Sequence, residues 1–236
     1  MSHLYVCARN LLCAASLFSF AASSFAATIV LGPSIPLSDL LAPSAFIEVG
    51  DKKFTDFTYA FTGNVPSATG VNVIPIQDMA GNWGIRFQGG FLDLPGGNSS
   101  DALITFNVTA TDLTMLISDV HLAANVAVAG TGVSAVVETF LPSFPNSSLL
   151  VLATPGSTIL TDSIIFDTPV RTLPVQKDII LFAEGAGSAA LLSFVDQTFS
   201  QVPDPNQNEI AEPATISMVG LLGMFLGAIH MRRRLG

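Results

Sequence analysis

Side chains that could do acid–base chemistry are few in this 236-residue chain, and histidine is the scarcest of them. His121 is the one histidine away from the two ends, which excludes a three-histidine zinc site from the central part of the chain. Asp119 precedes it by two residues, a spacing that places both side chains on one face of a β-strand. The carboxylate could orient the imidazole for a serine–histidine–acid triad, although the chain has no Gly-x-Ser-x-Gly motif. A surface pair without a catalytic role is the alternative.

Oxygen ligands are more plentiful, and among metal ions they would suit calcium. Asp93, Asn98 and Asp101 form the densest group, because the loop 96–101 is rich in glycine and polar residues. The loop lacks an Asp-x-Asp-x-Asp-Gly pattern, so a polar turn that binds nothing is the alternative interpretation. We expect no cofactor other than calcium.

Two carboxylates across a cleft could hydrolyse a glycosidic bond. The acidic residues, however, mostly fall where turns and strand ends are expected, as Asp51, Asp78 and Asp162 do. Cysteine chemistry is excluded from the central part, since Cys7 and Cys13 both lie near the N-terminus. We therefore predict that the protein is not an enzyme and has no catalytic residues.

Trp83 and Arg86 are the residues best suited to hold a sugar ring, by stacking and by hydrogen bonding. Trp83 is the only tryptophan in the chain. A single tryptophan also serves to pack a core or the edge of a strand, so the sugar-stacking and core-packing interpretations both stay open.

The charge balance argues against nucleic acid as a partner. Residues 27–211 contain seventeen acidic residues against five basic ones, a net charge of −12 by count. A surface this acidic repels phosphate backbones. It suits a protein that stays soluble outside the cell, and it leaves cation binding open.

The elements expected to position these side chains are β-strands, because apolar and polar residues alternate and no helical period recurs. The clearest alternation runs from Ala102 to Ala110, with apolar residues at every second position. Turn residues such as those at 95–98 separate the segments. The pattern predicts an all-β fold, an antiparallel β-sandwich that is jelly-roll-like. Strands are expected at 45–49, 57–61, 71–76, 84–91, 102–110, 117–123, 134–141, 149–153, 158–166, 175–182 and 190–199.

The two ends of the chain differ from this body. Residues 1–26 are predicted to be a secretory signal peptide, with Arg9, an apolar run at 11–20, and Ser24 and Ala26 at the positions that signal peptidase selects. The apolar run is too short to cross a bilayer core of roughly 30 Å. Residues 27–200 are then the β-sandwich body, and residues 201–211 are expected to be a flexible linker rich in proline and polar residues.

The C-terminal segment, residues 212–236, has three parts in a fixed order. Glu212, Pro213, Ala214 and Thr215 come first, an apolar run follows to Ile229, and the arginines 232–234 close it: Arg232, Arg233 and Arg234. Residues 214–229 would make a helix about 24 Å long, a marginal membrane span. We predict a transmembrane helix over about 214–231, with the body outside the inner membrane and the arginines in the cytoplasm.

This arrangement resembles the PEP-CTERM sorting signal of Gram-negative bacteria that make extracellular polysaccharide. Glu212 and Pro213 match the second and third positions of Pro-Glu-Pro, and Ala211 replaces the first proline. The phrases at 49–54, 83–91 and 196–201 are similar to phrases in uncharacterised PEP-CTERM proteins. The resemblance implies an exosortase-like processing enzyme as a partner, transient anchoring in the inner membrane, and delivery to the cell surface or extracellular matrix. A single-pass anchor that is never cleaved is the alternative.

The sequence thus predicts an exported, non-enzymatic surface or matrix protein linked to exopolysaccharide and biofilm. A carbohydrate- or calcium-binding adhesin module is the second hypothesis, with extracellular polysaccharide as the partner. A polysaccharide hydrolase based on two carboxylates is the third.

Overall fold

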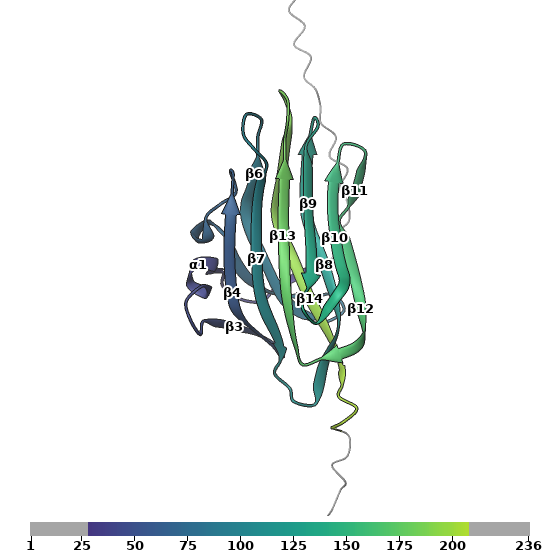
Figure 1. Ribbon diagram of the computed structural model, residues 1–236. Coiled ribbons are helices and arrows are strands. Elements are labelled where there is room, and N and C mark those ends of the chain that lie inside the picture. The colour runs from purple at the N-terminus through teal and green to yellow at the C-terminus, as the bar shows by residue number, and fades with distance from the viewer. Residues whose placement is uncertain (1–27, 208–236) are drawn as a thin grey trace, which may run out of the picture.

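Residues 28–207 are described by the computed structural model, and they form two antiparallel sheets packed face to face (Figure 1). Sheet A has the order β1-β5-β6-β14-β8-β12, with β2 paired to β5, and sheet B has the order β11-β10-β9-β13-β7-β4-β3. The antiparallel β-sandwich predicted from the alternation is confirmed. The strands of sheet A are β1 (Thr28–Val30), β2 (Ile35–Pro36), β5 (Asn72–Asp78), β6 (Trp83–Asp93), β8 (Met115–Ala129), β12 (Thr161–Val170) and β14 (Ala189–Pro203).

The strands of sheet B are β3 (Phe46–Val49), β4 (Lys52–Thr62), β7 (Ser100–Ala110), β9 (Val133–Phe140), β10 (Phe144–Thr154), β11 (Ser157–Ile159) and β13 (Thr172–Phe182). The helical elements in residues 28–207 are one turn of α-helix, α1 (Leu37–Leu40), and one 3-10 turn, η1 (Ala68–Gly70). Figure 1 shows α1 beside the β3–β4 edge of the sandwich.

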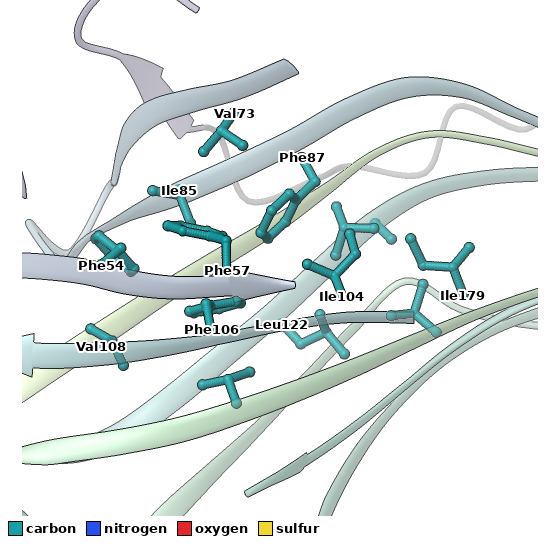
Figure 2. Close-up of a cluster of buried hydrophobic side chains, with 14 of the residues drawn as sticks. Phe54, Phe57, Val73, Ile85, Phe87, Ile104, Phe106, Val108, Leu122 and Ile179 are labelled. Atoms are coloured by element: carbon teal, nitrogen blue, oxygen red, sulfur yellow. The ribbon is translucent and has the colours of Figure 1, made fainter. Parts of the chain in front are cut away.

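The core lies between the sheets and is built by the alternation that the sequence displays. On β7, Ala102, Ile104, Phe106, Val108 and Ala110 are all at most 2% exposed, as the period of two requires. Figure 2 shows the aromatic centre of this core, where Phe57 and Phe106 stack at 5.6 Å between ring centroids and Phe87 lies 5.7 Å from Phe106. Burial of each such ring stabilises the fold by about 1.5–3 kcal/mol.

Every predicted strand falls on an observed one, with one correction. The segment 158–166, predicted as a single strand, is divided at Leu160 between β11 and β12, which belong to different sheets. The chain crosses between the layers here, and the segment has no glycine or proline that would have marked the break in the sequence.

β14 continues to Pro203, so the first three residues of the predicted linker are paired with β8. This long strand is the centre of sheet A, between β6 and β8. It therefore sets the position of the side chains on both faces of that sheet.

Candidate functional site

The face of sheet A that is turned away from sheet B carries a hollow with a volume of about 370 Å³. We call it the sheet A groove. Its lining includes four hydroxyl groups, three carboxylates and one imidazole, which suits a ligand bound through hydrogen bonds. The lining residues are Thr28, Asp78, His121, Leu122, Ala123, Thr161, Asp162, Ser163, Asp196 and Thr198.

β14 supplies the floor of the sheet A groove because its side chains alternate between the two faces of the sheet. Val195, Gln197 and Phe199 point into the core and are fully buried. Asp196 and Thr198 point the other way, yet each is only 4% exposed. Their neighbours on the outer face therefore cover most of their surface, so the floor is held in place by its surroundings.

The strand register explains where the groove is hollow. Thr198 lies opposite His121 on β8, and His121 lies opposite Ser163 on β12, so these side chains form one row across the sheet. In the next row Ala123 lies between Asp196 and Thr161. Ala123 contributes only a methyl group, so this row is open between the carboxylate and the hydroxyl.

An ion pair holds one side of the floor. Arg86 on β6 donates from Nε to Asp196 Oδ1 at 2.6 Å and from Nη2 to Asp196 Oδ2 at 2.8 Å. Thr28 also donates to Asp196 Oδ2 at 2.9 Å, and the guanidinium lies 3.9 Å from the ring centroid of Phe194. A bidentate, stacked arginine fixes both the position and the charge of the carboxylate.

Asp78 closes the groove at the end of β5 and accepts hydrogen bonds from three neighbours. These are the backbone N–H groups of Ala80 and Asn82, the Asn82 amide and the Thr198 hydroxyl, all at 2.9 Å. Partial burial acts to raise the pKa of Asp78, but the hydrogen bonds outweigh it and the pKa is lowered. Asp78 is therefore an ionised hydrogen-bond acceptor at neutral pH.

His121 and Asp119 form the pair that their spacing in the sequence predicted. Nε2 of His121 lies 3.1 Å from Asp119 Oδ1, and the His121 side chain is 42% exposed. The Ser200 backbone N–H also donates to Asp119 at 3.1 Å. Ser163 stands opposite His121, but no hydrogen bond joins these two side chains in the described part of the chain. The arrangement can present an imidazole to a ligand without forming the linked triad of a serine hydrolase.

The structure does not bring the predicted calcium ligands together. Asp93 is 1% exposed and accepts hydrogen bonds from the Ser100 hydroxyl at 2.7 Å and from the Ala183 backbone N–H at 2.8 Å. Asn98 is exposed in the turn after β6. Asp101 faces outward on sheet B. Residues 28–207 contain no cluster of three or more acidic, histidine or cysteine side chains arranged to hold a metal.

Asp101 instead lies close to Asp178 on the outer face of sheet B. Partial burial, followed by the charge of Asp101 and a hydrogen bond with it, raises the pKa of Asp178 to about 6. The pKa of Asp178 gives this face a titration near pH 6 that the sequence did not indicate.

Trp83 and Arg86 have separate roles. Trp83 is partly buried against the core, and its ring covers Gly50 so closely that a Cβ there would stand 2.2 Å from the ring. Trp83 therefore packs against the sandwich, which favours the core-packing interpretation of this residue. Arg86 belongs to the sheet A groove through Asp196.

Sequence reasoning missed the groove as a unit. Asp196 and Arg86 are 110 residues apart, and Thr28 and Asp196 are 168 apart. Only the His121–Asp119 pair carries a local signal. Polar residues at solvent-facing positions of neighbouring strands would have indicated the groove, but this signal can be used only when the order of the strands in the sheet is known.

The predicted sorting and signal residues lie outside the described residues. These are Ser24, Ala26, Glu212, Pro213, Ala214, Thr215, Arg232, Arg233 and Arg234. The helix predicted over about 214–231 also lies there. Within residues 28–207, no helix is long and apolar enough to span a membrane.

Comparison with known proteins gives no family. No family model matches the sequence, and no curated protein does. Among solved structures, TmCBM61 in complex with beta-1,4-galactotriose is similar at a TM-score of 0.30 and 11% identity, over 61% of this chain and 88% of that one. The enzymatically active domain of bacteriophage CBA120 tailspike protein 4 is similar at a TM-score of 0.28 and 14% identity, and the match covers 65% of this chain and 20% of that one. A family 29 carbohydrate binding module is similar at a TM-score of 0.20 and 14% identity, and the match covers 61% of this chain and 90% of that one. At these TM-scores the likeness carries no functional argument, and the geometry of the groove must carry it.

Proposed function

We propose that this chain is a non-enzymatic, extracellular carbohydrate-binding protein that holds a mono- or disaccharide unit in the sheet A groove. The observation that carries the proposal is the fixed Arg86–Asp196–Thr28 floor beneath an open row of hydroxyl and carboxylate groups. A volume of about 370 Å³ lies at the small end of the range of roughly 300–1,000 Å³ for small-ligand pockets.

The chemistry of the groove matches that of a sugar. Each sugar hydroxyl both donates and accepts a hydrogen bond, so it needs acceptors and donors side by side. Thr161 and Ser163 supply hydroxyl groups that both donate and accept, and His121 supplies a ring nitrogen. Asp162 accepts one backbone N–H on each oxygen and keeps further acceptor capacity. The acidic lining favours a neutral or basic saccharide over one that carries uronate groups.

The binding is expected to be weak for a single sugar unit. No phenylalanine, tyrosine or tryptophan lines the groove, so the stacking energy that aromatic platforms supply is missing there. Recognition by exposed hydrogen bonds gives dissociation constants on the order of 1 mM, or about −4 kcal/mol. Many copies on one polysaccharide would raise the effective affinity.

The protonation state of Asp78 supports binding without hydrolysis. A glycosidase needs one carboxyl group that keeps its proton at working pH. Asp78 shows the opposite tendency, because its hydrogen bonds lower its pKa. We infer that the groove holds a saccharide in place and leaves its glycosidic bonds intact.

The proposal includes the predicted route to the cell surface. A signal peptide and a PEP-CTERM-like tail would deliver the body to the outside, where polysaccharide is present. There the protein would support exopolysaccharide or biofilm structure, with an exosortase-like enzyme acting on the tail. An intact-mass measurement of the secreted protein tests this part, since a recovered C-terminus at Gly236 contradicts cleavage.

The binding proposal is tested with a glycan array probed by the purified protein, with and without added calcium. Thr161→Ala combined with Ser163→Ala removes two exposed hydroxyl groups of the groove that make no side-chain hydrogen bond within residues 28–207. Thr168→Ala, on the exposed part of the same strand outside the groove, is the matched control. Binding that depends on calcium favours the calcium-dependent adhesin, and silence on every glycan contradicts the proposal.

A further inference from the structure

A lysine, a glutamate and a glutamine meet in the middle of the hydrophobic core. Lys177 on β13 and Glu138 on β9 come from sheet B, and Gln197 on β14 comes from sheet A. All three side chains are fully buried, with 0% exposure. Because bulk water does not reach these side chains, any reaction between them takes place in a dry environment.

The contacts join all three residues. Lys177 Nζ donates to Glu138 Oε2 and, at 2.6 Å, to Gln197 Oε1. The carbonyl carbon of Gln197 is one bond of about 1.2 Å from that oxygen, so the amine nitrogen lies within about 3.8 Å of the carbon. The second oxygen of Glu138 has no hydrogen-bond partner among the described residues. An amine, an amide carbon and a free carboxyl oxygen are therefore within reach of one another.

Burial also favours the protonation states that a condensation needs. It lowers the pKa of Lys177 and raises that of Glu138, and the attraction between the two only partly offsets it. The pair is thus pushed towards a neutral amine, which is a nucleophile, beside a neutral carboxylic acid, which can donate a proton.

We propose that Lys177 and Gln197 form an intramolecular amide cross-link between the two sheets, with Glu138 as the proton-transfer group. Nζ of Lys177 attacks Cδ of Gln197, and the new N–C bond forms as the C–Nε2 bond breaks. One proton passes from Nζ through the Glu138 carboxyl to the leaving nitrogen, which departs as ammonia. The reaction consumes one amine and one primary amide, yields one secondary amide and one ammonia, and needs no oxidant or reductant.

The same core contact explains why these three residues are placed between the sheets. A bond from β13 to β14 ties sheet B to sheet A at a point where only side-chain packing otherwise joins them. The described residues contain no cysteine, so a disulfide is not available for this purpose. A protein exposed outside the cell gains resistance to forced separation of its sheets.

Lys52 offers an internal comparison. It too is buried and lies 2.7 Å from Asp51, but that carboxylate is 40% exposed. Water can reach the charged group there, so we expect an ordinary ion pair and no condensation.

Mass spectrometry of the full exported protein tests the cross-link. The intact mass is expected to be about 17 Da below the mass computed from the sequence, for the loss of one ammonia. Trypsin is expected to leave the Lys177–Asp178 bond uncut even in denatured protein, because acylated lysine is not a substrate. Fragment ions should locate the mass loss in the peptide that begins at Thr172.

Two variants separate this cross-link from a purely structural hydrogen-bond network. Glu138→Gln keeps the shape of the side chain but cannot shuttle the proton, and it should restore the full mass and cleavage at Lys177. Lys53→Met, at a lysine outside the core cluster, should keep the mass loss and the resistance at Lys177. An unchanged mass with normal cleavage in the parent protein overturns the proposal. A loss of about 18 Da overturns it too, since water would leave only if Lys177 condensed with Glu138. Sugar binding is measured separately, so failure of one idea leaves the other standing.

Discussion

Replacing Arg86 with methionine should destabilise the protein strongly, because it leaves a nearly buried carboxylate without its cation. Asp196 is 6% exposed at its side chain and Arg86 is 16% exposed. The substitution removes two charge-assisted hydrogen bonds and leaves Asp196 with Thr28 alone. Breaking such a pair from one side costs about 3 kcal/mol. For a domain of this size, the melting temperature should fall by about 6–12 °C.

The assay is urea unfolding followed by tryptophan fluorescence, with thermal unfolding as a second readout. Arg86→Met combined with Asp196→Leu removes both partners and should recover about half of the lost stability, since no unpaired charge remains. Lys53→Met is the control for loss of one positive charge at a more accessible site, and it should change stability by less than about 0.5 kcal/mol. An Arg86→Met protein as stable as its parent would refute the account of the groove floor.

Two further predictions concern positions away from the groove. Asp178→Asn should flatten the pH dependence of stability between about pH 4 and 6. The pKa of Asp178 is raised to about 6 in the folded protein, so its contribution is full below pH 4 and is lost as the pH rises through 6. Because this group is only partly buried, the effect should be about 1 kcal/mol or less, and an unchanged pH profile of urea midpoints counts against the pairing with Asp101. Gly50→Ala should cost about 2–4 kcal/mol, because Gly50 has a φ of +57° and a Cβ would stand 2.2 Å from Trp83. Gly97→Ala, where a Cβ meets nothing within 4 Å, should be neutral in the same thermal assay.

The fold class could be predicted because each strand of a sandwich shows the alternation of apolar and polar residues within its own short segment. Alternation over residues 102–110 follows from the two faces of β7, one buried and one open. Strand order could not be predicted in this way. Pairing between β14 and β8 joins segments roughly 70 residues apart, and the residues of one strand do not indicate which other strand it pairs with. The division between β11 and β12 was missed for the same reason.

The candidate site shows the same limit. The His121–Asp119 pair is local, and its spacing sufficed to predict a shared face. The Arg86–Asp196 pair depends on register between two strands that are distant in sequence, so its chemistry is visible only once β6 and β14 are side by side. The buried Lys177–Glu138–Gln197 cluster is harder still, because sequence patterns place charged residues at the surface by default.

The charge count separates what the composition excludes from what it leaves open. An acidic body argues against nucleic acid, and the groove agrees with this, since it is lined by Asp78, Asp162 and Asp196. The same acidity suggested calcium, but the two candidate ligands lie apart and have other partners. Asp93 is buried on the inner face of sheet A, whereas Asp101 lies on the outer face of sheet B beside Asp178. Composition therefore indicated the character of the surface and could not locate a site on it.

Titration of the purified protein with the saccharide that gives the strongest glycan-array signal tests the central claim most directly. Isothermal calorimetry on the parent, on Thr161→Ala/Ser163→Ala and on Thr168→Ala compares a groove change with a matched change elsewhere on β12. We predict at least a tenfold loss of affinity, or about 1.4 kcal/mol, for the groove variant, and no change for Thr168→Ala. Equal affinity in all three proteins would contradict a saccharide site in the sheet A groove.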